Sequence, residues 1–505
     1  MRIACLALTC LIAARASFAG ESPAAPAAKA TPAAPNSTPP LALEPCRLEH
    51  PSHLTAVAAE CGTLSLPENP AAPRGRHIEL YVARVPAINR RKQPDALFVL
   101  AGGPGMAASA FYASVEPLLE RIHRDRDIVL VDQRGTGRSN GLYCKLNEDA
   151  LWHATEIALA AETHECLVKL EAHADLAFYT TSLAVQDLEA VRAALGYERI
   201  DLYAVSYGTR VAQHYLRRFP ARVRAVILDG VVPPQRALGS TAALDAEAAL
   251  GRILERCTRD AQCRARFGDP AAAYRALRTA LPAHPIEVSV ADPQSGEPVK
   301  FAFTALHLAA VLRLSSYSSE LAALLPLSLD LAQRQGNFGP LAAQFLLINH
   351  SYEDAIAYGM HNTVVCSEDV PYYDTSPEAR EQLARTYLGT AQLDGLVSVC
   401  AAWPRGPVDR DFHAPVRTQT PLLLLSGSDD PVTPPAYAQQ VAHGLGASVL
   451  SVVIDGMGHG QLTAPCVDRL MARFINAGTV AGLDASCTQH VHAVPFFTSL
   501  AGPPP

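Results

Sequence analysis

The sequence predicts an α/β fold, with a mostly parallel central sheet flanked by helices and a large helical lid inserted between two halves of the core. Three observations predict it. Short apolar runs, each followed at once by a polar or glycine-rich loop, occur in two separate blocks of the chain. Helical patterns follow several of these runs, as in units that build parallel sheets. Between the two blocks, the chain is rich in alanine and leucine and has few strand patterns.

The first element next to a candidate catalytic residue is the apolar run Asp201–Val205. It ends at Ser206, and a helical pattern begins directly after this serine. A sharp turn from strand to helix exposes a serine hydroxyl and aims the next backbone N–H at a reacting carbonyl. Small residues two before and two after the serine let the flanking segments approach, and here they are Ala204 and Gly208. Ser206 is therefore the candidate nucleophile, although a plain surface turn could have the same local pattern.

A second element, the apolar run Asp95–Leu100, precedes the glycine-rich segment Ala101–Gly105. Glycines let backbone N–H groups point in unusual directions, which an oxyanion hole requires. Pro104 has no N–H, so we expect the donors to be Gly103 and Tyr207, the residue after the candidate nucleophile. The alternative is an ordinary turn after a strand.

A base and an orienting acid follow two later strands. Asp430 comes after the run Pro421–Ser426, and His459 comes after Val449–Ile454. The order Ser206, Asp430, His459 is the chain order of the triad in α/β hydrolases, and loops after parallel strands meet at one edge of the sheet. The residues therefore predict a serine hydrolase.

Two other aspartates compete for the role of the acid. Asp429 is adjacent to Asp430, and Asp229 ends the strand pattern Ala225–Leu228. We prefer Asp430 because a Pro-Val-Thr-Pro segment that opens a helix follows it.

At this point the chain resembles a known family. Its segments Ala-Gly-Gly-Pro-Gly, Val-Asp-Gln-Arg-Gly-Thr-Gly-Arg-Ser and Ser-Tyr-Gly-Thr are similar to the proline-iminopeptidase branch of the α/β hydrolases. Further segments resemble the secreted tripeptidyl-aminopeptidases of that branch, and they begin at Cys61, Ile227, Cys366, Cys400 and Asp430. The chain departs from the family pattern at Ala101, where histidine is usual, and at Ala204, where glycine is usual.

The resemblance implies an α/β-hydrolase fold and an exported aminopeptidase that releases short peptides or residues from a free N-terminus. Such an enzyme has to bind a cationic amino group, so acidic side chains should face its pocket. The lid residues Glu368 and Asp369, in the segment that the resemblance also indicates, are the candidates. The alternative is a solvated acidic pair. The chemistry needs no cofactor.

Composition excludes several other classes of protein. The net charge is −7 over 505 residues, and no basic block, cluster of stacking aromatics or zinc-ligand spacing occurs. We therefore expect neither nucleic acid nor metal as a partner, but a peptide or small-molecule substrate.

The first 19 residues are typical of a cleaved signal peptide. Arg2 precedes a short apolar stretch, and Ser17-Phe-Ala19 suits the peptidase that removes such segments. The stretch is too short for a permanent membrane anchor. Cys10 raises the alternative of a lipoprotein, but the residues before it do not fit one well. We expect export to the periplasm or the extracellular space.

The cysteine spacing agrees with export. Of 12 cysteines, all but Cys5 and Cys10 lie beyond the predicted signal peptide. They fall into pairs near in sequence, which indicates local disulfides in an oxidising compartment. The predicted pairs are Cys46–Cys61, Cys144–Cys166, Cys257–Cys263, Cys366–Cys400 and Cys466–Cys487.

These patterns divide the chain. We expect a signal peptide at 1–19, an Ala/Pro-rich linker at 20–40, core halves at 41–231 and 419–478, a helical lid at 232–418 and a C-terminal tail at 479–505. Two alternatives to an aminopeptidase stay open, because a fold does not fix a substrate. One is an esterase or other small-molecule hydrolase, and the other is a non-catalytic relative that only binds.

Overall fold

The computed structural model describes residues 41–502, except 54, 145–155, 282–283 and 353–354. The predicted signal peptide and linker lie outside the described residues. Within the described ranges, no helix combines the length and the apolar character needed to cross a bilayer.

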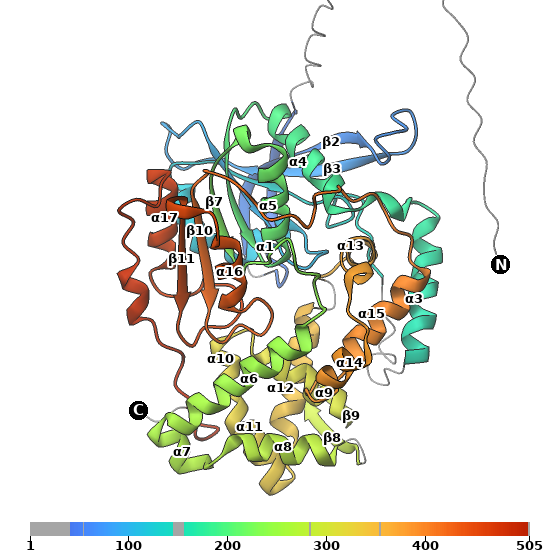
Figure 1. The fold of residues 1–505 in the computed structure, drawn as a ribbon, viewed down its shortest axis with the longest axis vertical. Coiled ribbons are helices and arrows are strands. Elements are labelled where there is room, and N and C mark those ends of the chain that lie inside the picture. The colour runs from blue at the N-terminus through green and yellow to red at the C-terminus, as the bar shows by residue number, and fades with distance from the viewer. Residues whose placement is uncertain (1–40, 54, 145–155, 282–283, 353–354, 503–505) are drawn as a thin grey trace, which may run out of the picture. The chain divides into compact units, whose positions relative to one another are not determined.

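A nine-stranded sheet in the order β1-β2-β3-β5-β4-β6-β7-β10-β11 forms the centre of the described chain (Figure 1). The pairs from β1 to β5 along this order are antiparallel, and all pairs from β5 to β11 are parallel. Five of the parallel strands, β4, β6, β7, β10 and β11, are those that the apolar runs predicted. The strands are β1 Glu44–Glu49, β2 Ala56–Pro67, β3 His77–Val85, β4 Ala96–Leu100, β5 Ile128–Val131, β6 Ile200–Val205, β7 Val223–Asp229, β10 Leu422–Gly427 and β11 Val449–Ile454.

Helices cover both faces of this sheet, which explains why the parallel strands are continuous apolar runs rather than alternating ones. Alternate residues of β6 enter opposite cores: Leu202 packs with α4, α5 and α16, and Tyr203 packs with α1 and α17. The covering helices are α1 Ala108–His123, α4 Thr181–Ala194, α5 Tyr207–Arg218, α16 Pro435–Ala442 and α17 Val467–Ala477.

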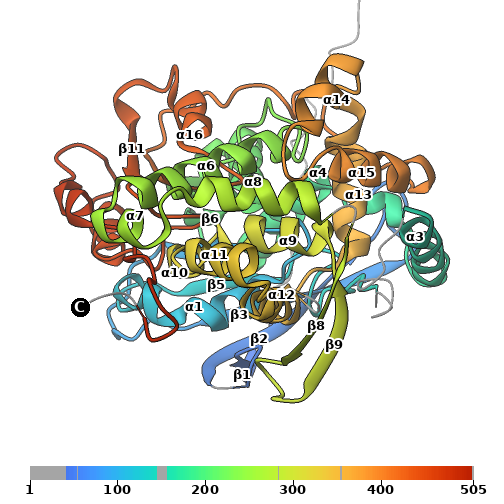
Figure 2. The ribbon, with the colours of Figure 1, turned by 90° about the horizontal axis from the view of Figure 1, so that it is seen from below.

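The segment between β7 and β10 leaves the sheet and forms two parts. The first part has its own apolar core, centred on buried residues such as Leu254, Phe303 and Leu329, and it lies below the sheet in Figure 1. Figure 2 looks at this layer from below. Its helices are α6 Ala242–Arg259, α7 Ala261–Phe267, α8 Pro270–Ala280, α9 Ala305–Ser315, α10 Ser319–Ala322, α11 Leu325–Gln335 and α12 Gly339–Tyr352.

A two-stranded antiparallel hairpin, β8 Ile286–Ala291 with β9 Pro298–Phe303, belongs to this first part. The lid is therefore not purely helical as the sequence analysis expected. The alternation in Ile-Glu-Val-Ser-Val-Ala is typical of a half-buried strand, and Val288, Phe301 and Phe303 are the buried positions of the hairpin.

The second part packs on the main core instead. The helices α13 Tyr358–Glu368 and α15 Ala391–Ala402 contribute Met360, Val365 and Cys400 to the same cluster as α4 and α5. They lie beside α3 Glu156–Glu171 in both views (Figures 1 and 2), and α14 Pro377–Ala384 connects them. Trp403, which follows α15, is buried and donates its indole N–H to Thr363 Oγ1 at 3.0 Å.

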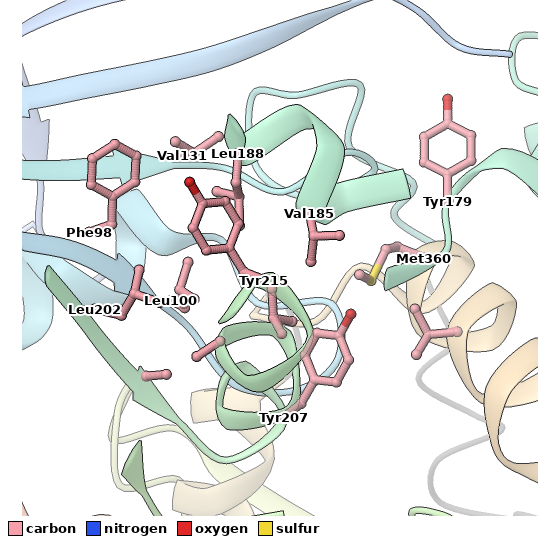
Figure 3. Packing of buried hydrophobic residues seen from close by; sticks show 14 of the residues in the cluster. Phe98, Leu100, Val131, Tyr179, Val185, Leu188, Leu202, Tyr207, Tyr215 and Met360 are labelled. Carbon is pink, nitrogen blue, oxygen red and sulfur yellow. The ribbon is translucent and has the colours of Figure 1, made fainter. Parts of the chain in front are cut away.

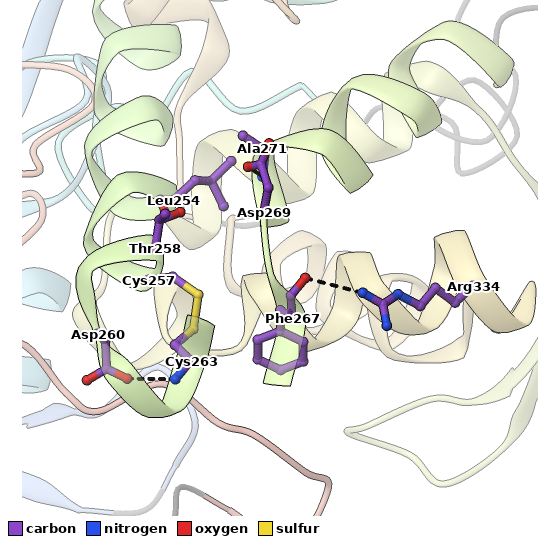
Figure 4. Close-up of a disulfide and its surroundings, with 9 residues drawn as sticks. All are labelled: Leu254, Cys257, Thr258, Asp260, Cys263, Phe267, Asp269, Ala271 and Arg334. Atoms are coloured by element: carbon purple, nitrogen blue, oxygen red, sulfur yellow. Dashed lines mark hydrogen bonds between the residues drawn. A yellow bond between two sulfur atoms is a disulfide. The ribbon is translucent and has the colours of Figure 1, made fainter. Parts of the chain in front are cut away.

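The structure joins the same five cysteine pairs that the spacing predicts. The bond between Cys257 and Cys263 ties the end of α6 to α7 (Figure 4). Beside it, Asp260 caps α7 by accepting the Cys263 N–H at 2.7 Å, and the Phe267 carbonyl accepts from Arg334 of α11 at 3.2 Å. The disulfide thus fixes the C-terminal end of α6, a helix whose first turn lines the cavity described next.

Candidate active site

The turn between β6 and α5 holds Ser206 in a strained conformation. Its backbone has φ 56° and ψ −127°, a region that residues other than glycine rarely adopt. The Ser206 N–H donates to the Asp229 carbonyl at 2.9 Å, which ties the turn to the neighbouring strand β7. Strain maintained by the surrounding fold is typical of functional sites.

The residues around this turn have to be small. A Cβ atom at Gly208 would lie 2.5 Å from the Leu100 carbonyl oxygen, so only glycine permits this approach of α5 to β4. A Cβ atom at Gly102 would lie 3.1 Å from the Cβ of Ser206. Ala204 is fully buried, so its methyl group is accommodated where the family usually has glycine.

His459 and Asp430 form a hydrogen-bonded pair, with His459 Nδ1 and Asp430 Oδ2 2.9 Å apart. Asp430 is fully buried and also accepts the N–H groups of Val432 and Thr433, each at 2.8 Å. The Thr433 hydroxyl donates to the same carboxylate at 2.7 Å. With Nδ1 bound to the carboxylate, the Nε2 atom of His459 is the one available to a serine proton.

The two groups shift each other's proton affinity. Burial disfavours the charged form of both, but the ion pair outweighs it. The pKa of Asp430 is therefore lowered by His459 and by its hydrogen bonds, and the pKa of His459 is raised by the Asp430 carboxylate. His459 is thereby prepared to accept a proton.

The rival acids have other partners. Asp229 accepts the Gln461 N–H at 2.8 Å and the Tyr203 hydroxyl at 2.9 Å. Burial raises its pKa to about 6. Asp429 lies within 3.5 Å of Arg256. Neither rival bonds to His459, whereas Asp430 does.

Ser206 and His459 line one cavity of about 810 Å³, together with Gly102 and Gly103. This volume is within the range of roughly 300–1,000 Å³ that is usual for small-molecule sites. No hydrogen bond joins Ser206 Oγ to His459, and such contacts often tighten only when substrate binds.

The predicted oxyanion donors lie at this cavity. Gly103 lines it, and Tyr207 is the first residue of α5, where the helix leaves N–H groups without an internal acceptor. Within the described part of the chain, neither the Gly103 nor the Tyr207 N–H has an acceptor.

The lid closes the cavity from the other side. Tyr317 follows α9, and its carbonyl accepts the backbone N–H of His459 at 2.9 Å. The ring of Tyr317 packs edge-to-face against the His459 imidazole, with the ring centroids 5.1 Å apart. Asp245 of α6 and Arg313 of α9 also line the cavity. These three residues could not be predicted from the sequence, because no local pattern relates a lid helix to a distant loop.

Glu368 and Asp369 lie elsewhere, which corrects the prediction that they face the substrate. Both are fully buried, and neither is among the residues that line the cavity. Glu368 accepts the Thr181 N–H at 2.6 Å and the Thr181 hydroxyl at 2.8 Å, while Asp369 pairs with Arg210 at 2.7 Å. Burial, and then the neighbouring Asp369, raise the pKa of Glu368 to about 8, so it is a poor partner for an ammonium group.

These buried acids instead support the first turn of α5. The Thr181 hydroxyl that contacts Glu368 is 2.6 Å from the Tyr207 hydroxyl. Gln133 donates to the Tyr207 hydroxyl at 3.0 Å. The Tyr207 ring packs in the core beside Val185 and Met360 (Figure 3). The helix that carries the Tyr207 N–H is thus held from several directions.

Metal ligands are not assembled in this part of the molecule. Within the described ranges, no group of three or more His, Cys, Asp or Glu side chains is placed to hold a metal ion.

Comparison with protein families gives two matches. Residues 95–264 match the model of the alpha/beta hydrolase fold, and residues 385–487 match the model of TAP-like proteins. The first range contains Ser206, and the second contains Asp430 and His459.

Among curated relatives, the serine protease Hip1 of Mycobacterium tuberculosis is 26% identical over 487 residues, covering 89% of this chain and 91% of the relative. Carboxylesterase B of the same species is 26% identical over 502 residues, covering 92% of both. The tripeptidyl aminopeptidase of Streptomyces lividans is 29% identical over 194 residues, covering 35% of this chain and 36% of the relative. Among solved structures, the proline iminopeptidase of Mycobacterium smegmatis has a TM-score of 0.38 and 17% identity, and covers 83% of this chain and 98% of that chain.

Proposed function

We propose that the chain, a serine hydrolase of the α/β-hydrolase fold with TAP-like relatives, is an exported aminopeptidase which releases short peptides or residues from free N-termini. The observation that carries the proposal is the geometry of the cavity. Ser206, His459 and the lid residue Asp245 line one cavity, and Asp430 binds His459 from behind.

In the proposed reaction, His459 takes the proton of Ser206 as Oγ attacks the peptide carbonyl, and Asp430 stabilises the imidazolium that forms. The N–H groups of Gly103 and Tyr207 bind the oxyanion. The acyl-enzyme then releases the amine product, which receives its proton from His459, and water completes the hydrolysis.

Asp245 is the acid that we propose for binding the substrate amino group. Tyr437 and Thr241 donate to its Oδ2 atom at 2.6 and 2.8 Å, which fixes the carboxylate. The Oδ1 atom has no partner among the described residues. A fixed carboxylate with one unoccupied oxygen in a cavity wall is suited to an ammonium group.

The test is a panel of aminoacyl, dipeptidyl and tripeptidyl amides, each with a free or an acetylated N-terminus, assayed beside simple esters. The wild-type enzyme should prefer the free amines. Asp245→Asn should lower kcat/KM for free-amine substrates roughly tenfold or more, since hydrogen bonds to charged groups contribute strongly, and should leave the acetylated substrates nearly unchanged.

Glu255→Gln is the matched control, because Glu255 is an exposed acid on the same helix and does not line the cavity. It should behave like wild type. Equal losses of Asp245→Asn on free and acetylated substrates would contradict the assignment of Asp245, and a wild type that cleaves only esters would contradict the aminopeptidase.

An esterase is the second candidate. Its support is the cavity wall, which includes the apolar side chains of Phe111, Val115 and Leu314, and the full-length similarity to a protein named carboxylesterase B. The ester arm of the panel distinguishes the two candidates.

Export is supported by the five disulfides, which persist in oxidising compartments and are rare in the cytosol. Fractionation of cells that produce the full chain tests it: we expect the mature protein outside the cytoplasm, and accumulation in the cytoplasm would contradict export.

A further inference from the structure

One cation in the cavity wall has no charged partner among the residues that the structure describes. Arg313 of α9 lines the cavity and donates from Nη1 to Gln392 Oε1 at 3.0 Å. It forms no ion pair with any described carboxylate. A guanidinium has five N–H donors in a fixed fork, so most of its donors are available to a molecule in the cavity.

The other arginine lining the cavity, Arg236, differs in this respect. Its guanidinium lies over the ring of Tyr437, 4.3 Å from the centroid, and donates to Gln440 at 3.2 Å. The Tyr437 hydroxyl beside it binds the carboxylate of Asp245. Arg236 therefore has an aromatic partner and a nearby negative charge, whereas the partners of Arg313, Gln392 and the Tyr317 hydroxyl, are neutral.

The neighbours of Arg313 indicate how it lies relative to His459. The charge of Arg313 acts against protonation of His459, and Arg313 is also close to Tyr317, whose ring contacts the imidazole. In acyl transfer the leaving group receives its proton from the histidine, so the leaving group has to lie next to the imidazole. Arg313 is thus near the imidazole that would protonate the leaving group.

We infer that Arg313 binds a carboxylate on the leaving group, so that short peptides with a free C-terminus are the preferred substrates. Guanidinium groups pair with carboxylates in a bidentate geometry. This inference deepens the proposed function and rests on it for the peptide. A cavity of about 810 Å³ that is lined by the carboxylate of Asp245 and by the cationic Arg313, whose partners are neutral, suits a short zwitterionic chain.

The experiment compares pairs of substrates that differ only in this charge. One pair is a tetrapeptide with a C-terminal carboxylate and the same tetrapeptide as its amide. The other pair is 4-acetoxybenzoate and its methyl ester. Loss of the acetyl group releases a phenol that bears a carboxylate from the first compound and a neutral methyl ester from the second. The second pair tests Arg313 even if the enzyme cleaves no peptide.

For wild type we expect kcat/KM to be higher for the charged member of each pair, by roughly tenfold to a hundredfold, as is typical of a charge-assisted bond. Arg313→Gln should remove this preference by lowering kcat/KM of the charged member alone, and Arg313→Lys should restore part of it. Arg264→Gln, which alters an exposed arginine of α7, should retain it.

Two results would overturn the inference. One is a wild type that shows no preference for the charged member in either pair. The other is an Arg313→Gln enzyme that loses activity equally on charged and neutral members, which would mean that Arg313 only holds α9 against Gln392. A preference in the ester pair without any peptide cleavage would support the Arg313 site and contradict the aminopeptidase.

Discussion

Ser206→Ala should reduce kcat by about 10⁶-fold, the loss typical of removing the nucleophile from a serine hydrolase. In the proposed mechanism, the Ser206 hydroxyl forms the acyl-enzyme, so its removal should eliminate the covalent step. The substitution removes one oxygen from a half-buried position and leaves the backbone bond to Asp229 in place. The fold should therefore be unchanged.

Steady-state kinetics on the best substrate of the panel, with circular dichroism and a melting curve for each protein, check this expectation. Ser182→Ala is a suitable control, because Ser182 is a buried serine outside the cavity lining. A Ser206→Ala enzyme that retains a substantial part of its activity would reject Ser206 as the nucleophile.

Asp430→Asn should reduce kcat by about 10⁴-fold, as the equivalent change does in other serine hydrolases. The amide cannot stabilise the imidazolium and favours the wrong tautomer of His459. The change is nearly isosteric, so Val432 and Thr433 still find an acceptor at this position. Asp429→Asn is the matched control and should leave kcat close to wild type, since Asp429 faces Arg252 and Arg256.

The pH profile gives this variant a second readout. His459 has to be neutral to accept the serine proton, so kcat/KM falls as the pH drops through its pKa. In wild type the Asp430 carboxylate raises that pKa above its ordinary value of 6.5. Without the carboxylate the pKa falls, so the acid limb of Asp430→Asn should move to lower pH. An acid limb at the wild-type position would mean that Asp430 is not the partner of the catalytic base.

The sequence predicted the elements whose structure is determined locally. A buried parallel strand is an apolar run that ends in a loop, so β6, β10 and β11 were visible together with Ser206, Asp430 and His459 beyond them. The order of these loops along the chain sufficed to group them, because the carboxyl ends of parallel strands share one edge.

The walls of the cavity could not be predicted in this way. Asp245 and Arg313 reach the cavity through the packing of α6 and α9 within the lid, and that packing depends on contacts far apart in the chain. The same applies to Glu368, which was expected to face the substrate. The Glu368 side chain is oriented by its hydrogen bonds to Thr181, which lies 187 residues earlier in the chain. The sequence around Cys366 does not indicate that contact.

Reaction of the wild-type protein with a fluorophosphonate probe, followed by mass spectrometry of its peptides, tests the central claim most directly. The probe reacts only with a serine activated by a nearby base. We predict a single adduct on Ser206, strongly reduced labelling of Asp430→Asn and none of Ser206→Ala. An adduct on another residue, or labelling that survives the loss of Ser206, would contradict the account.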